Sequence, residues 1–82
     1  MHRVVPAEQV RAEAFALAAR LAAGPTVAYR AIKTVLATAA TDSLEETLAL
    51  EARLQVHAGR TDDHREAVAA FLEKRPAEFT GR

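Results

Sequence analysis

Glycine and proline, which interrupt regular secondary structure, occur at only a few separated positions in this 82-residue chain, and their placement constrains its fold most strongly. The chain contains three glycines and three prolines. Between them lie four stretches of strong helix formers with apolar residues at helical spacing. The sequence predicts an all-α fold, a small bundle of about four helices in a single domain over residues 1–82, with helices at about 7–22, 26–38, 43–58 and 62–75.

Local signals mark the ends of these predicted helices. Gly24 is expected to supply a left-handed cap after the first helix, and Pro25 prevents that helix from continuing. Ser43, followed three residues later by Glu46, is typical of a capping box, in which each side chain binds the backbone amide of the other residue. The third predicted helix therefore begins at Ser43.

The fourth predicted helix begins with a cap at 61–63, where two aspartates follow a threonine and complement the positive end of the helix. Lys74 and Arg75 are expected in its last turn, where cations suit the carbonyl end, and Pro76 stops it. The tail that follows is predicted to be extended, with Phe79 as its anchor.

Large apolar side chains are few for a self-sufficient domain of this size. Alanine accounts for 20 of the 82 residues. A chain of this length buries only about two-thirds or less of its unfolded surface. The expected buried faces are Val10, Leu17 and Leu21 in the first helix and Ala28, Ala31, Ile32, Val35 and Leu36 in the second.

The third predicted helix has apolar residues around most of its circumference, at Leu44, Leu48, Leu50, Leu54 and Val56. A helix of this kind is covered on several sides. The other three helices are too short and too alanine-rich to provide that cover. We therefore expect a missing partner surface, with self-association through the first, third and fourth helices.

The balance of charge excludes several classes of function. Eleven Lys and Arg residues match eleven Asp and Glu residues, so no positive field draws the chain to nucleic acid or to an anionic membrane. The absence of cysteine excludes disulfides and Cys-based zinc sites. No apolar stretch reaches the roughly 20 residues that cross a bilayer. The expected location is cytoplasmic, with neither nucleic acid nor membrane as a partner.

Candidate catalytic and metal-binding residues are weakly supported. Imidazole and carboxylate groups can bind metal, and they lie close in sequence at His57, Asp62, Asp63 and His64, but capping explains the aspartates better. Ser43 is the only serine and belongs to the capping box, which leaves none for a catalytic triad. We expect no catalytic residue, metal site or cofactor in this chain, and we expect Glu51 to pair with a basic residue if it is buried.

Phe71 and Lys74 form the most informative pair in the sequence. Three residues apart, they would share one face of a helix, so that a ring able to cover a nucleobase stands beside an ammonium able to meet a phosphate. The simpler alternative makes Phe71 a core residue and Lys74 a helix-end cation. From the residues alone, the simpler alternative is favoured.

The end of the chain carries an ordered set of short motifs. Residues 61–67 read Thr-Asp-Asp-His-Arg-Glu-Ala, and residues 70–81 read Ala-Phe-Leu-Glu-Lys-Arg-Pro-Ala-Glu-Phe-Thr-Gly. Upstream, Arg-Val-Val-Pro at 3–6, Ala-Gly-Pro at 23–25 and Ser-Leu-Glu-Glu at 43–46 complete the series. The ordered set resembles the C-terminal helical region of the enoyl-CoA hydratase/isomerase (crotonase) superfamily.

The resemblance implies a region that packs subunits into trimers or hexamers and closes over the site for an acyl-CoA substrate. It implies that Phe71 lies near the adenine of CoA, and Lys74 near a phosphate, in a neighbouring subunit. The family's reaction is hydration of trans-2-enoyl-CoA, and its catalytic core does not correspond to these residues, so the 82-residue chain alone is expected to be inactive. The alternative is a free-standing helical module that self-associates or binds a protein without catalysis.

Overall fold

The computed structural model describes residues 3–82, so Met1 and His2 of the predicted domain lie outside the described residues. One turn of 3-10 helix, η1 (Ala7–Gln9), leads into α1 (Val10–Ala22). The remaining helices are α2 (Thr26–Ala39), α3 (Leu44–Gly59) and α4 (Asp62–Glu73). The described residues contain no strand, and the predicted all-α class with four helices is confirmed.

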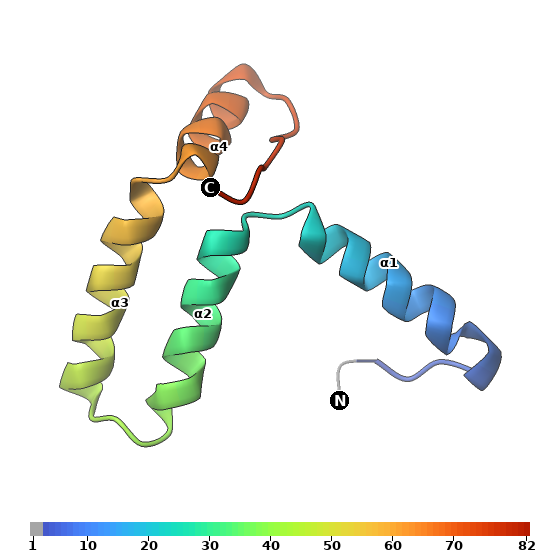
Figure 1. Cartoon of the computed structure of the whole chain (residues 1–82), viewed down its shortest axis with the longest axis horizontal. Coiled ribbons are helices and arrows are strands. Elements are labelled where there is room, and N and C mark those ends of the chain that lie inside the picture. Colours follow the sequence, from blue (N-terminus) through green and yellow to red (C-terminus); the bar gives the residue numbers. More distant parts are fainter. Residues whose placement is uncertain (1–2) are drawn as a thin grey trace.

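Helices α2 and α3 pack against each other as an antiparallel hairpin (Figure 1). The predicted capping box begins α3, where the Glu46 amide donates to Ser43 Oγ at 3.1 Å and the Ser43 amide donates to Glu46 Oε2 at 2.8 Å. The hydrogen bond from the Ser43 backbone lowers the pKa of the Glu46 carboxyl, and the bond to the Ser43 side chain adds to this effect. The local signal thus positions α3 as the sequence indicated.

Helix α1 extends away from the hairpin, and its packing within the chain is with η1 and the N-terminal lead-in (Figure 1). The radius of gyration is 16.0 Å. A compact domain of this length has a radius of gyration of about 12 Å. The four helices therefore do not enclose a shared core.

Very little apolar surface is buried within the chain. Ala70 is the one buried hydrophobic residue among those described, at 2% exposure. Ile32 and Leu36, which we expected to be buried, are exposed, as are Val10 and Leu21. The expectation for these four residues is wrong for the chain by itself, because α1 leaves the hairpin uncovered on that side.

The total exposed surface of the chain can be compared with that of a compact monomer of the same mass. The chain exposes 6875 Å². A compact monomer of its mass exposes about 4,800 Å². The excess of about 2,000 Å² far exceeds the roughly 800 Å² that one partner buries in an interface of standard size. The chain by itself therefore exposes far more surface than a compact monomer of its mass, and large apolar side chains are part of that surface.

Gly24 is buried at the junction of α1 and α2, but it does not have the left-handed conformation that we expected. The close contact at Gly24 is made by the side chain of Tyr29. A Cβ on Gly24 would overlap the ring of Tyr29, which lies against the glycine backbone. Glycine at this turn thus permits the close approach of an aromatic ring, which a larger residue would displace, and is not used for its backbone freedom.

None of the helices in residues 3–82 combines the length and apolar character that a membrane span requires.

Candidate functional site at the end of α4

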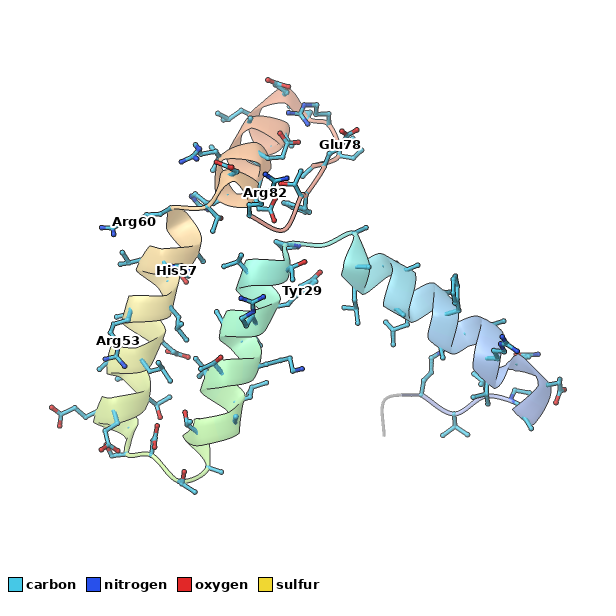
Figure 2. All side chains as sticks on the ribbon, in the orientation of Figure 1. Tyr29, Arg53, His57, Arg60, Glu78 and Arg82 are labelled. Carbon is cyan, nitrogen blue, oxygen red and sulfur yellow. The ribbon has the colours of Figure 1, made fainter. Side chains whose placement is uncertain are left out.

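The C-terminal tail folds back over the first turn of α4 (Figure 2). Thr61 caps the helix, because its Oγ1 accepts from the His64 amide at 3.1 Å. The Asp63 amide donates to the Arg82 carbonyl at 2.8 Å, so the tail itself satisfies a second amide at this helix start. The tail also reaches α2, since a Cβ on Gly81 would lie 3.6 Å from Thr26 Oγ1.

Asp63 is the anchor of this arrangement, and it is only 3% exposed. Its Oδ1 accepts from the Thr80 amide at 2.7 Å and its Oδ2 accepts from the Gly81 amide at 2.9 Å. Such charge-assisted bonds satisfy a buried carboxylate that would otherwise be costly to desolvate. The predicted cap at 61–63 is present and Asp63 lies in the first turn of α4, but its carboxylate binds amides of the returning tail instead of free amides of its own helix.

A second carboxylate, one turn further along α4, forms hydrogen bonds with the tail. Glu66 receives a two-pronged contact from Arg75, with Nη1 at 2.6 Å from Oε1 and Nη2 at 3.1 Å from Oε2. Glu66 Oε1 also accepts from the Glu78 amide at 3.0 Å, and Arg75 Nε donates to Glu73 at 2.6 Å. We call this set of contacts, made by Asp63, Glu66 and Arg75 to residues 73–82, the tail clasp.

The clasp alters the acid–base behaviour of its charged groups. The hydrogen bonds from Arg75 lower the pKa of Glu66 to about 2, with a further contribution from the Glu78 amide. The bond to Glu66, followed by the bond to Glu73, raises the pKa of Arg75. Both groups therefore remain charged at neutral pH, as a charge-assisted contact requires.

Lys74 lies immediately beyond α4 and has a left-handed backbone, with φ 55° and ψ 44°. The Lys74 amide donates to the Phe71 carbonyl at 3.3 Å and the Arg75 amide to the Ala70 carbonyl at 3.0 Å, the two bonds of a Schellman motif. We expected Lys74 and Arg75 in the last helical turn, and this is wrong. Pro76 disfavours helical geometry at Arg75 and Lys74 is left-handed, so the helix ends at Glu73, two residues before the expected end.

Phe71 lies in the last turn of α4 and Lys74 directly follows the helix, and both side chains are exposed. Phe71 is 81% exposed, which excludes the simpler alternative that it belongs to a core within this chain. The shared helical face that we expected is replaced by the Schellman turn, whose hydrogen bond brings the Lys74 backbone to Phe71. Phe71 and Lys74 are therefore linked through the backbone, and each has an exposed side chain.

Other candidates from the sequence are not gathered into a site. Within residues 3–82, no group of three His, Asp or Glu side chains is placed to hold a metal ion. His57 lies on α3, while His64 lies on α4, and Ser43 is engaged in its capping box. Glu51 is exposed and forms no ion pair with the described residues, so the buried pairing that we considered is not needed.

The tail clasp was missed at the level of sequence. Asp63 and Thr80 are 17 residues apart, and no periodic pattern links them. A usable signal did exist, because Arg75-Pro76 forces the chain out of the helix and brings the next residues back beside Glu66. Phe79, which we expected to be the anchor of the tail, is half-buried, while the hydrogen bonds to the tail are made by carboxylates.

An apolar groove of about 640 Å³ runs between α2 and α3. Ile32 and Leu36 line it from α2, and Leu48 lines it from α3. All three side chains are exposed. The groove lacks converging polar groups other than Glu51 and Gln55, so its chemistry suits apolar protein surface better than a polar ligand.

Comparison with known proteins identifies relatives across the whole chain. The sequence profile described as enoyl-CoA hydratase/isomerase matches residues 1–82. A probable enoyl-CoA hydratase of Rhodobacter capsulatus is 52% identical over 67 residues, which cover 82% of this chain and 26% of the relative. The 1,2-epoxyphenylacetyl-CoA isomerase of Escherichia coli K12 is 42% identical over 80 residues, covering 98% of this chain and 30% of that protein.

A solved structure shows the same arrangement of helices. The crystal structure of an enoyl-CoA hydratase subunit I from Geobacillus kaustophilus superposes with a TM-score of 0.94 at 36% identity. The match covers 100% of this chain and 32% of that one. The chain thus spans between a quarter and a third of the length of these relatives, and the open arrangement of its helices is that of a segment within a larger fold.

Proposed function

Because this chain belongs to the enoyl-CoA hydratase/isomerase family, we propose that it is the C-terminal trimerisation and CoA-covering region of an enoyl-CoA hydratase-like enzyme. The observation that carries the proposal is the exposed surface of 6875 Å², with Ala70 as the one buried hydrophobic residue among those described. Faces of this extent are stable only when other protein covers them. Other copies of the enzyme and its own catalytic core are the covering surfaces that we propose.

The apolar residues that remain exposed on three of the helices support association through α1, α3 and α4. Phe15 on α1, Leu48 on α3 and Leu72 on α4 are all at least half exposed. The α2–α3 groove adds Ile32 and Leu36 to this apolar surface. An interface built from these faces would be large and hydrophobic, as in obligate oligomers.

Sedimentation equilibrium of the 82-residue chain tests the association. We expect species heavier than the 8.9 kDa monomer and a shift toward the monomer in Leu48→Glu, which places a charge in an apolar interface. Arg53→Glu, which also introduces an acidic side chain on α3 but at an exposed polar position, is the control. A well-folded chain that stays strictly monomeric at high micromolar concentration would refute the association.

We propose that the exposed side chains of Phe71 and Lys74 cover CoA. An aromatic face can stack on the adenine ring, and an ammonium can pair with a phosphate. Contacts of these kinds contribute about 1 to 3 kcal/mol each. Both side chains are exposed in this chain and hence available to a ligand carried by a neighbouring subunit.

The reaction that we propose for the whole enzyme is addition of water across the double bond of a trans-2-enoyl-CoA. Water supplies a hydroxyl to Cβ and a proton to Cα, while the enolate-like thioester oxygen is stabilised by hydrogen-bond donors. The groups that carry out these steps lie in the part of the relatives that this chain does not span. We propose that the chain alone is inactive, and detectable hydration of an enoyl-CoA by the pure chain would contradict this.

A chimera tests the CoA contact directly. Residues 1–82 replace the segment that they superpose on in the Geobacillus kaustophilus enoyl-CoA hydratase, and KM for an enoyl-CoA is measured. Lys74→Met is expected to raise KM about tenfold or more, from the loss of one charge-assisted contact. Arg53→Met, which removes a cation from α3, should leave KM unchanged, and equal KM values for the two variants would refute the role of Lys74.

The same family membership leads us to propose a cytoplasmic enzyme that acts in fatty acid metabolism.

A further inference from the structure

Lys74 has a backbone conformation that its side chain disfavours. It is the only non-glycine residue with positive φ among the described residues. The position after a helix that adopts this conformation is usually glycine, because a Cβ crowds the backbone there. A strained residue of this kind persists only when the surrounding structure holds it in place.

The contacts around Arg75 supply that restraint. Arg75 directly follows Lys74, and its amide donates to the Ala70 carbonyl at 3.0 Å. Its guanidinium makes the two-pronged contact with Glu66 at 2.6 and 3.1 Å. Backbone and side chain of the residue after Lys74 are therefore both bound to α4.

Glu66 holds more than one segment at this point. Its Oε1 accepts from Arg75 and also from the Glu78 amide at 3.0 Å, so one carboxylate ties the residue after the turn to the returning tail. The carboxylate is three-quarters shielded, with 26% of the side chain exposed. A single change at Glu66 thus weakens the side-chain contact of Arg75 and the contact with the returning tail together, and leaves the backbone bonds of the turn as the remaining restraint on Lys74.

We propose that Glu66 is a positioning residue, which acts through Arg75 to hold Lys74 in its left-handed conformation and so sets the direction in which the Lys74 side chain leaves the turn toward the proposed CoA contact. The proposal rests on the proposed CoA contact of Lys74 and deepens it. Glu66 itself does not touch the ligand. Its effect on ligand binding passes entirely through the geometry of residue 74.

The first measurement is the backbone of Lys74 in the full 82-residue chain. The three-bond coupling between HN and Hα, together with the Cα and Cβ chemical shifts, reports φ at this residue. We expect Glu66→Gln to lose the coupling and chemical shifts that mark a left-handed backbone at Lys74. Arg75→Lys keeps the positive charge but cannot make the two-pronged contact with Glu66, and we expect it to lose the same signals. Glu45→Gln makes the same chemical change at an exposed site on α3 and should leave the signature intact.

The second measurement is a double-mutant cycle on KM in the chimera described above. Glu66→Gln is expected to raise KM several-fold, with a proportionally smaller change in kcat. Combined with Lys74→Met, it should add nothing beyond Lys74→Met alone, because both changes disable the same ammonium. Additive effects would overturn the proposal, since Glu66 would then act without Lys74.

The outcomes separate this proposal from the proposed function. If Lys74→Met leaves KM unchanged, the CoA contact is wrong and the positioning role in ligand binding fails with it. If Lys74→Met raises KM while Glu66→Gln matches Glu45→Gln, the CoA contact stands and the positioning role alone is overturned. If Glu66→Gln raises KM without changing φ at Lys74, the positioning role is likewise overturned.

Discussion

Asp63→Ala should release Thr80 and Gly81 from α4 while leaving the helix, and the contact of Glu66 with the tail, in place. The buried carboxylate accepts from the amides of Thr80 and Gly81 at 2.7 and 2.9 Å, and alanine offers no acceptor. A hydrogen bond to a charged group contributes about 1.5 to 3 kcal/mol. Once released, both amides can bind water, so the lower end of the range applies to each hydrogen bond. The expected loss of free energy that holds the tail residues is therefore about 3 kcal/mol.

Amide hydrogen exchange followed by NMR measures this change where it occurs. A loss of about 3 kcal/mol corresponds to roughly a 100-fold fall in the protection of the Thr80 and Gly81 amides. Asp62→Ala is a matched control, because it removes a carboxylate from the same helix turn. Asp62 is exposed and pairs only with Arg65 among the described residues.

The comparison of the two variants decides the reasoning. Both remove one negative charge near the positive end of α4, so the effect of the helix dipole is common to them. If Thr80 and Gly81 keep their protection in Asp63→Ala, or lose it equally in Asp62→Ala, the buried carboxylate does not hold the tail.

Further predictions concern the two helix ends and the acid response of the clasp. Ser43→Ala removes the cap of α3 and should cost about 1 kcal/mol of helix stability, seen as earlier thermal unfolding by circular dichroism; an unchanged transition would contradict it. Lys74→Gly relieves the left-handed strain and should stabilise the end of α4 by about 1 kcal/mol, while it weakens CoA binding in the chimera. The lowered pKa of Glu66 means that its contribution is complete above its ordinary value of 4.5 and is lost as pH falls toward about 2. Protection of the Glu78 amide should therefore persist at pH 5 and decline between pH 4.5 and 2, and a decline centred above pH 5 would refute the assignment.

The candidate site was only partly predictable. Phe71 and Lys74 could be selected because a ring and a cation near a helix end suit a nucleotide-like ligand. Their geometry could not be foreseen, because the usual mark of a left-handed cap is glycine and this position is lysine. The clasp depends on contacts between residues up to 19 apart, and sequence periodicity carries no information at that separation.

The sequence by itself determined the secondary structure and the family. Helix formers, the capping box at Ser43 and the break at Pro76 act over three or four residues, so they can be recognised without knowledge of the rest of the fold. Four helices at nearly the predicted bounds followed from these local rules.

Only the tertiary structure decided which faces the chain leaves uncovered. The expected burial of Ile32 and Leu36 assumed that the four helices cover one another, whereas α1 extends away and leaves both exposed. Hydrophobic pattern shows that a face must be buried, but it does not show which surface buries it. In this chain the described residues leave both side chains exposed, and only the tertiary structure shows that two carboxylates hold the tail to α4.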